Sequence, residues 1–288
     1  MTMDETTAVI GAEHNLVATF ASDPQAAQSG VALVLTNSGV IPRAGPHRMN
    51  VHLARCFAKR GIPSVRFDMS GLGDSRRASG RLATLEQWSS DTQSAMDAAQ
   101  QRFGTREFIM IGFCSGAEVA HVTAMKDERI RAVVLWDSFS YPTLQSQARA
   151  LVHRIARVGV RQAAGKAMAA ALWRRLSPQR PGADTTQGRM WQGEPDAIPP
   201  RDEYRGRLKT LVDRGVRILV MHSGGEPLSF NYRKQFDHTL GREGLKHKID
   251  FEYLDLADHL LTRSTSQTDF IRTVSAWIEG LDKPATNR

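Results

Sequence analysis

The sequence predicts an α/β protein in which helices cover a mostly parallel sheet. Runs rich in Val, Ile and Leu alternate along the chain with segments whose apolar residues recur at three- and four-residue intervals. This alternation of strands and helices is typical of a parallel sheet buried between helices. The 288 residues suit one large domain with an insertion, and no stretch reaches the roughly 20 apolar residues of a membrane span.

Eight segments have the composition of strands. The first two, residues 7–11 and 14–20, are close enough in sequence to form an antiparallel hairpin at one edge of the sheet. The other six are expected at residues 31–36, 63–68, 107–113, 131–137, 217–222 and 249–254. Four amphipathic helices are expected between or after them, at residues 47–60, 84–103, 115–125 and 265–281.

The alternation is interrupted between Ser138 and Arg214, which indicates an insertion after the sixth predicted strand. Residues 144–176 are rich in Ala, Leu and Arg and contain no proline, so we expect helices there. Residues 177–200 contain five prolines and three glycines, which is typical of a loop. We therefore predict a core formed by residues 1–138 and 215–288, with a helical lid inserted after strand 6 and formed by residues 139–214.

The net charge of +8 is concentrated in this insertion. Between Tyr141 and Arg180 there is no acidic residue, and there are eight basic ones: Arg149, Arg154, Arg157, Arg161, Lys166, Arg174, Arg175 and Arg180. Such a segment attracts an acidic partner, whether protein, anionic lipid or nucleic acid. Nucleic acid is not expected, because the segment offers only Trp173 for stacking and contains no known binding motif.

Composition also narrows the location and the chemistry. The start, MTMDETTAVI, lacks the basic flank and apolar run of a secretory signal, so we expect a cytoplasmic protein. Two cysteines, Cys56 and Cys114, are too few for a disulfide framework or a cysteine-rich metal site, and we expect Cys56 to pack in the core. The glycines of RFDMSGLGDS (residues 66–75) lack the rest of a phosphate-binding pattern. We therefore expect a turn there, and no cofactor or metal.

The strongest functional motif is GFCSG, in which Gly112 and Gly116 flank Cys114. A predicted strand leads into the cysteine and a predicted helix follows it, which is the pattern of a nucleophile held on a sharp strand-to-helix turn. Ser115 is a poorer candidate nucleophile, because its register would put Phe113 in a glycine position. The positive end of the helix dipole favours a thiolate at Cys114. The alternative is a small, inert cysteine that only packs.

The partners of such a nucleophile follow it along the chain, first an acid and then a histidine. His259 stands in DLADHLLT after the last strand, where the general base belongs. Glu226, in GGEP after the strand at 217–222, is the favoured acid to orient this histidine. Asp137 is the alternative acid, since it ends the neighbouring strand and a carboxylate there can reach the same imidazole.

An oxyanion hole requires backbone N–H groups near the nucleophile. We expect one from Ser115 and a second from Gly39 or Val40, in the loop NSGVIPRAGPHR after the strand at 31–36. The substrate pocket is expected to be formed by the lid and by three aromatic residues at the end of the strand before it: Trp136, Phe139 and Tyr141.

Together these features resemble the α/β-hydrolase superfamily. The resemblance rests on the elbow GFCSGA, the run from Arg43 to Ser75, the DH of LADHLL and the acidic turn GGEP. The R-x-G-x-H-R loop that starts at Arg43, combined with a cysteine elbow, is similar to the branch that contains exosortase-associated hydrolases and cysteine-dependent aminoacyl transferases. The similarity covers residues 31–138 and 217–281 and does not extend to the basic insertion.

The resemblance implies acyl transfer through an acyl-cysteine, with Cys114 as nucleophile and His259 as base. Glu226 departs from the aspartate that is commoner in the family. The aminoacyl transferases of this branch move acyl groups between carrier proteins in nonribosomal peptide pathways, which are part of secondary metabolism. An acidic phosphopantetheinyl carrier protein could then dock on the basic segment.

Three functional hypotheses follow. An acyl-cysteine is a thioester, nearly equal in energy to a thioester on a phosphopantetheine arm, so transfer to a thiol, alcohol or amine is the leading hypothesis. Hydrolysis of the same intermediate by water, as in an esterase or thioesterase, is the second. The third is a catalytically silent module that binds an acidic partner through its basic lid.

Overall fold

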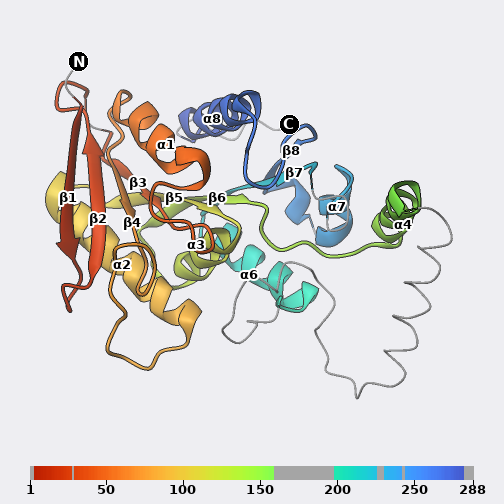
Figure 1. The fold of residues 1–288 in the computed structure, drawn as a ribbon, viewed down its shortest axis with the longest axis horizontal. Helices are drawn as coiled ribbons and strands as arrows, with labels where there is room; N and C mark the ends of the chain where they lie inside the picture. The colour runs from red at the N-terminus through yellow and green to blue at the C-terminus, as the bar shows by residue number, and fades with distance from the viewer. Residues whose placement is uncertain (1–2, 28, 159–197, 226–229, 242–243, 282–288) are drawn as a thin grey trace.

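The structure is a computed structural model that describes residues 3–27, 29–158, 198–225, 230–241 and 244–281. Within them, eight strands form one sheet in the order β1-β2-β4-β3-β5-β6-β7-β8 (Figure 1). The strands are β1 (Asp4–Ile10), β2 (Leu16–Ser22), β3 (Val31–Leu35), β4 (Ser64–Phe67), β5 (Glu107–Phe113), β6 (Ile130–Trp136), β7 (Arg217–Ser223) and β8 (Asp250–Leu254). All eight predicted strands are confirmed, with ends shifted by a few residues.

The sheet is mostly parallel, as the sequence predicts. β1 and β2 form an antiparallel hairpin at one edge, and β2 also pairs antiparallel with β4. All later pairs, from β3 with β4 to β7 with β8, are parallel. The central strands β3, β5 and β6 are continuous apolar runs because helices bury both of their faces. The loops that follow these parallel strands meet at one edge of the sheet, where the candidate site lies.

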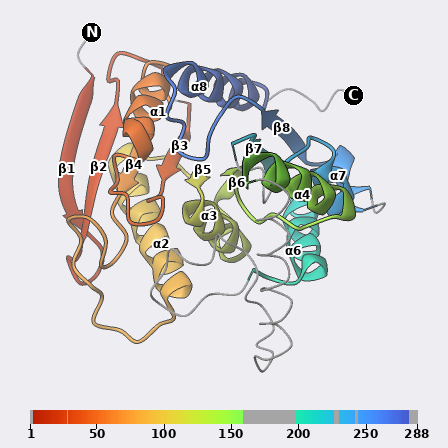
Figure 2. The same ribbon diagram turned by 45° about the vertical axis from the view of Figure 1, so that its right-hand side comes forward.

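Helices cover both faces of the sheet (Figures 1 and 2). One face packs on α1 (Met49–Ala58) and α8 (Ser264–Glu279), whose apolar residues share one core cluster with alternate residues of β3, β5 and β6. The other face packs on α2 (Thr84–Phe103), α3 (Ser115–Lys126) and α6 (Arg201–Asp213), which share a second cluster. In the described ranges, no helix is both long enough and apolar enough to cross a membrane.

Of the residues assigned to the insertion, the structure describes two helices, α4 (Leu144–Val158) and α6, and α6 packs into the core. α4 follows β6, where the sequence predicts a helical segment, and residues 159–197 lie outside the described ranges. α6 was not predicted, yet Tyr204, Leu208 and Leu211 are buried against the second cluster at helical spacing. α7 (Gln235–Leu240) and the 3-10 turns at Pro46–Arg48 and Leu245–His247 were also not predicted. The proposed lid boundary at residue 214 thus includes a helix that packs as part of the core.

Candidate active site

Cys114 occupies the sharp turn between β5 and α3. Its backbone has φ 55° and ψ −121°, a conformation that costs energy in a residue with a side chain. Its N–H donates to the carbonyl oxygen of Trp136 on the adjacent strand β6, at 2.9 Å. This hydrogen bond anchors the backbone of the turn to the next strand.

The two glycines of the motif leave room for this turn. A Cβ on Gly112 would lie less than 3.0 Å from the backbone of Gly116, and a Cβ on Gly116 would lie less than 3.0 Å from the carbonyl oxygen of Asn37. Real Cβ atoms do not approach backbone atoms that closely. The spacing G-x-C-x-G is thus explained by two close contacts, one between β5 and α3 and one between α3 and the loop after β3.

His259 and Asp137 meet beside this turn. Asp137 follows β6 with φ 45°, and its N–H donates to the carbonyl oxygen of Met221 at 2.8 Å. Its carboxylate is buried and its Oδ2 lies 2.9 Å from Nδ1 of His259. Since an ionised carboxylate can only accept, Nδ1 of His259 carries the proton, and Nε2 is left for the nucleophile.

The electrostatics of the pair favour a charged imidazole. Hydrogen bonds with Asp137 and then with Cys114 raise the pKa of His259 from 6.5 to about 10. Burial alone would raise the pKa of the Asp137 carboxyl, but hydrogen bonds from His222 and His259 outweigh burial and hold this pKa well below its usual range. At neutral pH the arrangement therefore places an imidazolium between the Asp137 carboxylate and Cys114.

The favoured acid of the sequence analysis, Glu226, lies outside the described residues. The two residues before it are held close to the histidine loop, because Gly224 N–H donates to Leu254 and Gly225 N–H donates to Ala257, both at 2.9 Å. The structure thus brings the alternative acid, Asp137, to His259, and the role of Glu226 stays a prediction.

Asp258, next to His259, forms hydrogen bonds within its own loop. Its Oδ1 accepts the backbone N–H of Thr262 at 2.9 Å, and its carbonyl accepts the N–H of Leu261 at 3.1 Å. Leu261 has φ 55°, so the chain turns sharply directly after His259. These bonds shape the loop that presents the imidazole.

Trp136 has a different place from the one we predicted. We expected it to line a substrate pocket, but its side chain is fully buried and packs edge-on against Phe270 of α8, with ring centroids 5.2 Å apart. Its indole N–H donates to the carbonyl oxygen of His259 at 2.9 Å. Trp136 therefore fixes the backbone of the histidine loop from inside the core, because side chains at alternate positions of β6 point to opposite faces.

Phe139 and Tyr141, the other two expected pocket residues, are also buried. Both rings contact Tyr204 of α6, with centroids 5.2 Å and 5.6 Å away. The Tyr141 hydroxyl donates to the carbonyl oxygen of Pro199 at 2.8 Å. These contacts tie the start of the insertion to its end, next to the catalytic edge of the sheet.

The expected oxyanion loop contacts the elbow directly. The N–H of Gly39 donates to Oγ of Ser115 at 2.9 Å. Gly39, with φ 56°, and Val40 are the central residues of a turn in which Ile41 N–H donates to Ser38. Because the Gly39 N–H is engaged by a side chain, the backbone N–H groups of Val40 and Ser115 are the better candidates for the oxyanion hole.

A buried carboxylate at the end of β4 holds this loop in place. Asp68 is fully buried and accepts four hydrogen bonds: from Asn37 Nδ2 (3.0 Å), the Arg43 backbone N–H (2.6 Å), the Arg43 guanidinium (2.6 Å) and the Asp74 N–H (3.1 Å). A Cβ on Gly73, which has φ 51°, would overlap this carboxylate. The GLGDS segment is therefore a turn, as predicted, and it wraps around the group that orders the oxyanion loop.

Two residues of the site were not predicted. His222 and Ser223 end β7 beside Asp137. Ser223 donates its N–H to Oδ1 at 2.8 Å and its hydroxyl to Oδ2 at 2.7 Å, and Nδ1 of His222 lies 3.3 Å from Oδ1. The sequence signal that could have identified them is this polar pair itself, which stands at the carboxyl end of the strand next to Asp137.

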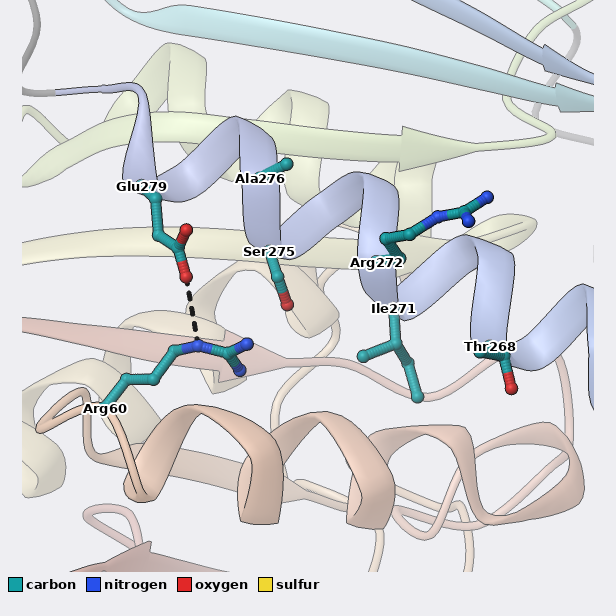
Figure 3. A pocket seen from close by; sticks show the side chains of 7 residues that line it. All are labelled: Arg60, Thr268, Ile271, Arg272, Ser275, Ala276 and Glu279. Atoms are coloured by element: carbon teal, nitrogen blue, oxygen red, sulfur yellow. Dashed lines mark ion pairs between the residues drawn. The ribbon is translucent and has the colours of Figure 1, made fainter.

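The second cysteine lies apart from these residues. We expected Cys56 in the core, but it is only partly buried and its Sγ contacts the guanidinium of Arg60 at the end of α1. A groove of about 430 Å³ runs beside it between α1 and α8, where Arg60 pairs with Glu279 at 3.1 Å (Figure 3). Apart from Arg60, the residues that line this groove are on α8, and none of Cys114, His259 and Asp137 lines it.

Of the basic segment, the structure describes only the part on α4. Arg149 packs over the ring of Tyr232, with its guanidinium carbon 5.2 Å from the ring centroid. The five basic residues after residue 158 lie outside the described ranges. In the described part of the chain, no three His, Cys, Asp or Glu side chains are grouped to hold a metal ion.

The fold and the site define a class of protein, namely an α/β protein whose elbow residue, histidine and buried carboxylate meet at the carboxyl edge of a mostly parallel sheet. The model of the alpha/beta hydrolase fold family matches residues 37–209. The match covers more than half of the chain, and the protein belongs to this family. No curated protein matches the sequence.

Solved structures agree with this assignment. The chain is similar to an esterase from Pyrococcus furiosus, with 12% identity, a TM-score of 0.59, and coverage of 96% of this chain and 90% of that chain. It is also similar to an α/β serine hydrolase without a lid from Xanthomonas campestris, with 14% identity, a TM-score of 0.55, and coverage of 99% and 98%. At these identities the likeness concerns the fold alone.

Proposed function

We propose that the protein is an acyl-transfer enzyme whose triad is Cys114, His259 and Asp137. The observation that carries the proposal is the 2.9 Å contact between His259 Nδ1 and the buried Asp137 carboxylate, on an imidazole that also hydrogen-bonds Cys114. A cysteine that only packs needs neither a strained backbone nor a histidine oriented by a buried charge. Glu226, the acid favoured from the sequence, becomes the alternative in this proposal.

The reaction proposed for this site has two balanced halves. The Cys114 thiolate attacks the carbonyl carbon of an acyl thioester, and the N–H groups of Ser115 and Val40 stabilise the resulting oxyanion. The bond to the leaving thiol then breaks, and the leaving sulfur takes the proton from Nε2 of His259. An acceptor thiol, alcohol or amine next gives its proton to Nε2, attacks the acyl-cysteine and releases the thiolate.

Transfer is favoured over hydrolysis by the identity of the nucleophile. The acyl-cysteine and a phosphopantetheine thioester are nearly equal in energy, so the acyl group exchanges readily between thiols. We propose an acidic carrier protein as the donor, because the basic α4 lies next in sequence to the β6 end of the site and attracts such a partner. Hydrolysis is the second candidate, because the similar structures include an esterase and a serine hydrolase.

The fate of a radiolabelled acyl pantetheine thioester, with and without a second pantetheine thiol, tests this proposal. We expect label on the acceptor, dependence on Cys114, and full activity in the matched control Cys56→Ala. Release of free acid at the same rate regardless of acceptor would reject transfer and favour a thioesterase. Unchanged cellular activity in Cys114→Ala and His259→Ala proteins would reject both and favour a silent binding module.

A further inference from the structure

Asp137 contacts two imidazoles, one at each oxygen. Oδ2 accepts the N–H of His259 at 2.9 Å, and Oδ1 lies 3.3 Å from Nδ1 of His222. Ser223 adds one hydrogen bond to each oxygen. The mechanism above uses the Oδ2 side of this carboxylate and leaves His222 without a role.

His222 is held rigidly in its position. His222 is 2% exposed, and its ring stacks on Phe230 with centroids 4.0 Å apart and planes 5° from parallel. Phe251 of β8 packs on it at a tilt, with centroids 6.1 Å apart. Because an ionised carboxylate only accepts hydrogen bonds, the ring nitrogen that faces Oδ1 must carry its proton.

A carboxylate can rotate about its last side-chain bond and exchange its two oxygens. Donors on Oδ1 oppose this rotation, since any turn that moves Oδ2 away from His259 also breaks the contacts of Oδ1. Among the described residues, the titratable neighbours of the ring are Asp137, His259 beyond it and Tyr253, the partner of His222 on β8, whose pKa is raised by burial. The ring is therefore placed to orient the acid rather than to meet the substrate.

We propose that His222 is a positioning residue that holds Oδ1 of Asp137, so that Oδ2 stays aligned with His259 and Cys114 stays reactive. The proposal rests on the proposed function, because it assumes Asp137 as the acid of the triad. It adds a fourth residue, which acts through Asp137 and touches neither the substrate nor the reacting sulfur.

Two substitutions separate this role from packing. His222→Phe keeps a ring that can stack on Phe230 but removes the donor. His222→Asn places an amide N–H near the position of Nδ1 but removes the stack. A packing role predicts that the asparagine variant is the more damaged of the two, whereas a positioning role predicts that the phenylalanine variant loses reactivity and the asparagine variant recovers it.

The readout is the rate at which iodoacetamide alkylates Cys114, measured from pH 5 to pH 9 in a Cys56→Ala background. This assay needs no substrate, and urea unfolding of each variant reports packing separately. We expect alkylation at pH 6 to fall about 30-fold in His222→Phe, within the range found when a reacting group is misplaced by about 1 Å. His222→Asn should recover most of this loss even though it is less stable.

The outcomes are distinguishable. If the parent protein alkylates no faster than free cysteine at pH 6, the proposed function fails and the role of His222 fails with it. If the parent protein reacts rapidly and His222→Phe reacts equally rapidly, only the role of His222 is overturned. If His222→Phe does not fold, His222→Asn compared with His222→Ala decides, because both lose the stack and only one keeps the donor.

Discussion

Replacing Asp137 by asparagine removes the buried negative charge and keeps the shape of the side chain. Four donors converge on the native carboxylate, from His259, His222 and both polar groups of Ser223. An amide keeps one acceptor oxygen and turns N–H groups toward donors, so the imidazolium of His259 loses its counter-charge and its orientation. The variant therefore tests the acid of the triad directly.

The size of the expected effect follows from the pKa of His259. The pKa of His259 rises from 6.5 to about 10, first through Asp137 and then through Cys114. A rise of this size corresponds to roughly 5 kcal/mol in favour of the imidazolium. If about half of it belongs to Asp137, the asparagine variant should weaken proton transfer from Cys114 to His259 by a factor of about 70 in its equilibrium constant.

Alkylation of Cys114 by iodoacetamide at pH 6, in a Cys56→Ala background, reports this proton transfer because the thiolate is the reactive form. We expect Asp137→Asn to slow alkylation by about 70-fold and Glu226→Gln to leave it nearly unchanged. Circular dichroism of both proteins controls for folding. A native rate in Asp137→Asn together with a large loss in Glu226→Gln would refute the assignment and return the acid to Glu226.

Three further predictions concern the frame of the site. Gly116→Ala should destabilise the fold by about 3 kcal/mol or more in urea unfolding, because its Cβ would overlap the carbonyl of Asn37; a native midpoint would contradict this. Burial lowers the pKa of His121 to about 4, so the unfolded chain alone gains a proton between pH 6.5 and 4, and stability should fall by up to about 3 kcal/mol over that range. His121→Phe should remove this fall, and an unchanged pH dependence would show that His121 is not its source. Asp68→Asn should lower the rate of acylation more than the rate of alkylation, since it loosens the loop held through Arg43; equal losses would argue against a role in oxyanion stabilisation.

The elbow and the base were predictable because their signals are local. Two glycines flank Cys114 between a strand and a helix, and His259 follows the last strand directly. The acid was not predictable in this way, because two carboxylates follow adjacent predicted strands and the sequence alone does not say which of them contacts the imidazole. The backbone of Asp137 has φ 45°, and this turn accompanies the contact of its carboxylate with His259. No local sequence pattern encodes that turn.

Other parts of the structure were missed for identifiable reasons. His222 is the last residue of the strand predicted at 217–222, so it resembles the end of a buried strand rather than part of a site. α6 carries Tyr204, Leu208 and Leu211 at helical spacing, but it lies before the next predicted strand, so we assigned it to the insertion. Trp136 was assigned to a pocket because it ends β6. Its side chain points to the face of the sheet that α1 and α8 cover, so it is buried in the core.

The central claim is that an acyl group becomes covalently attached to Cys114. Intact mass spectrometry after incubation with a panel of acyl pantetheine thioesters tests it most directly. We predict a mass increase equal to the acyl group in the native protein and in Cys56→Ala, and none in Cys114→Ala. An equal increase in Cys114→Ala, or no increase with any thioester in the native protein, would contradict the account.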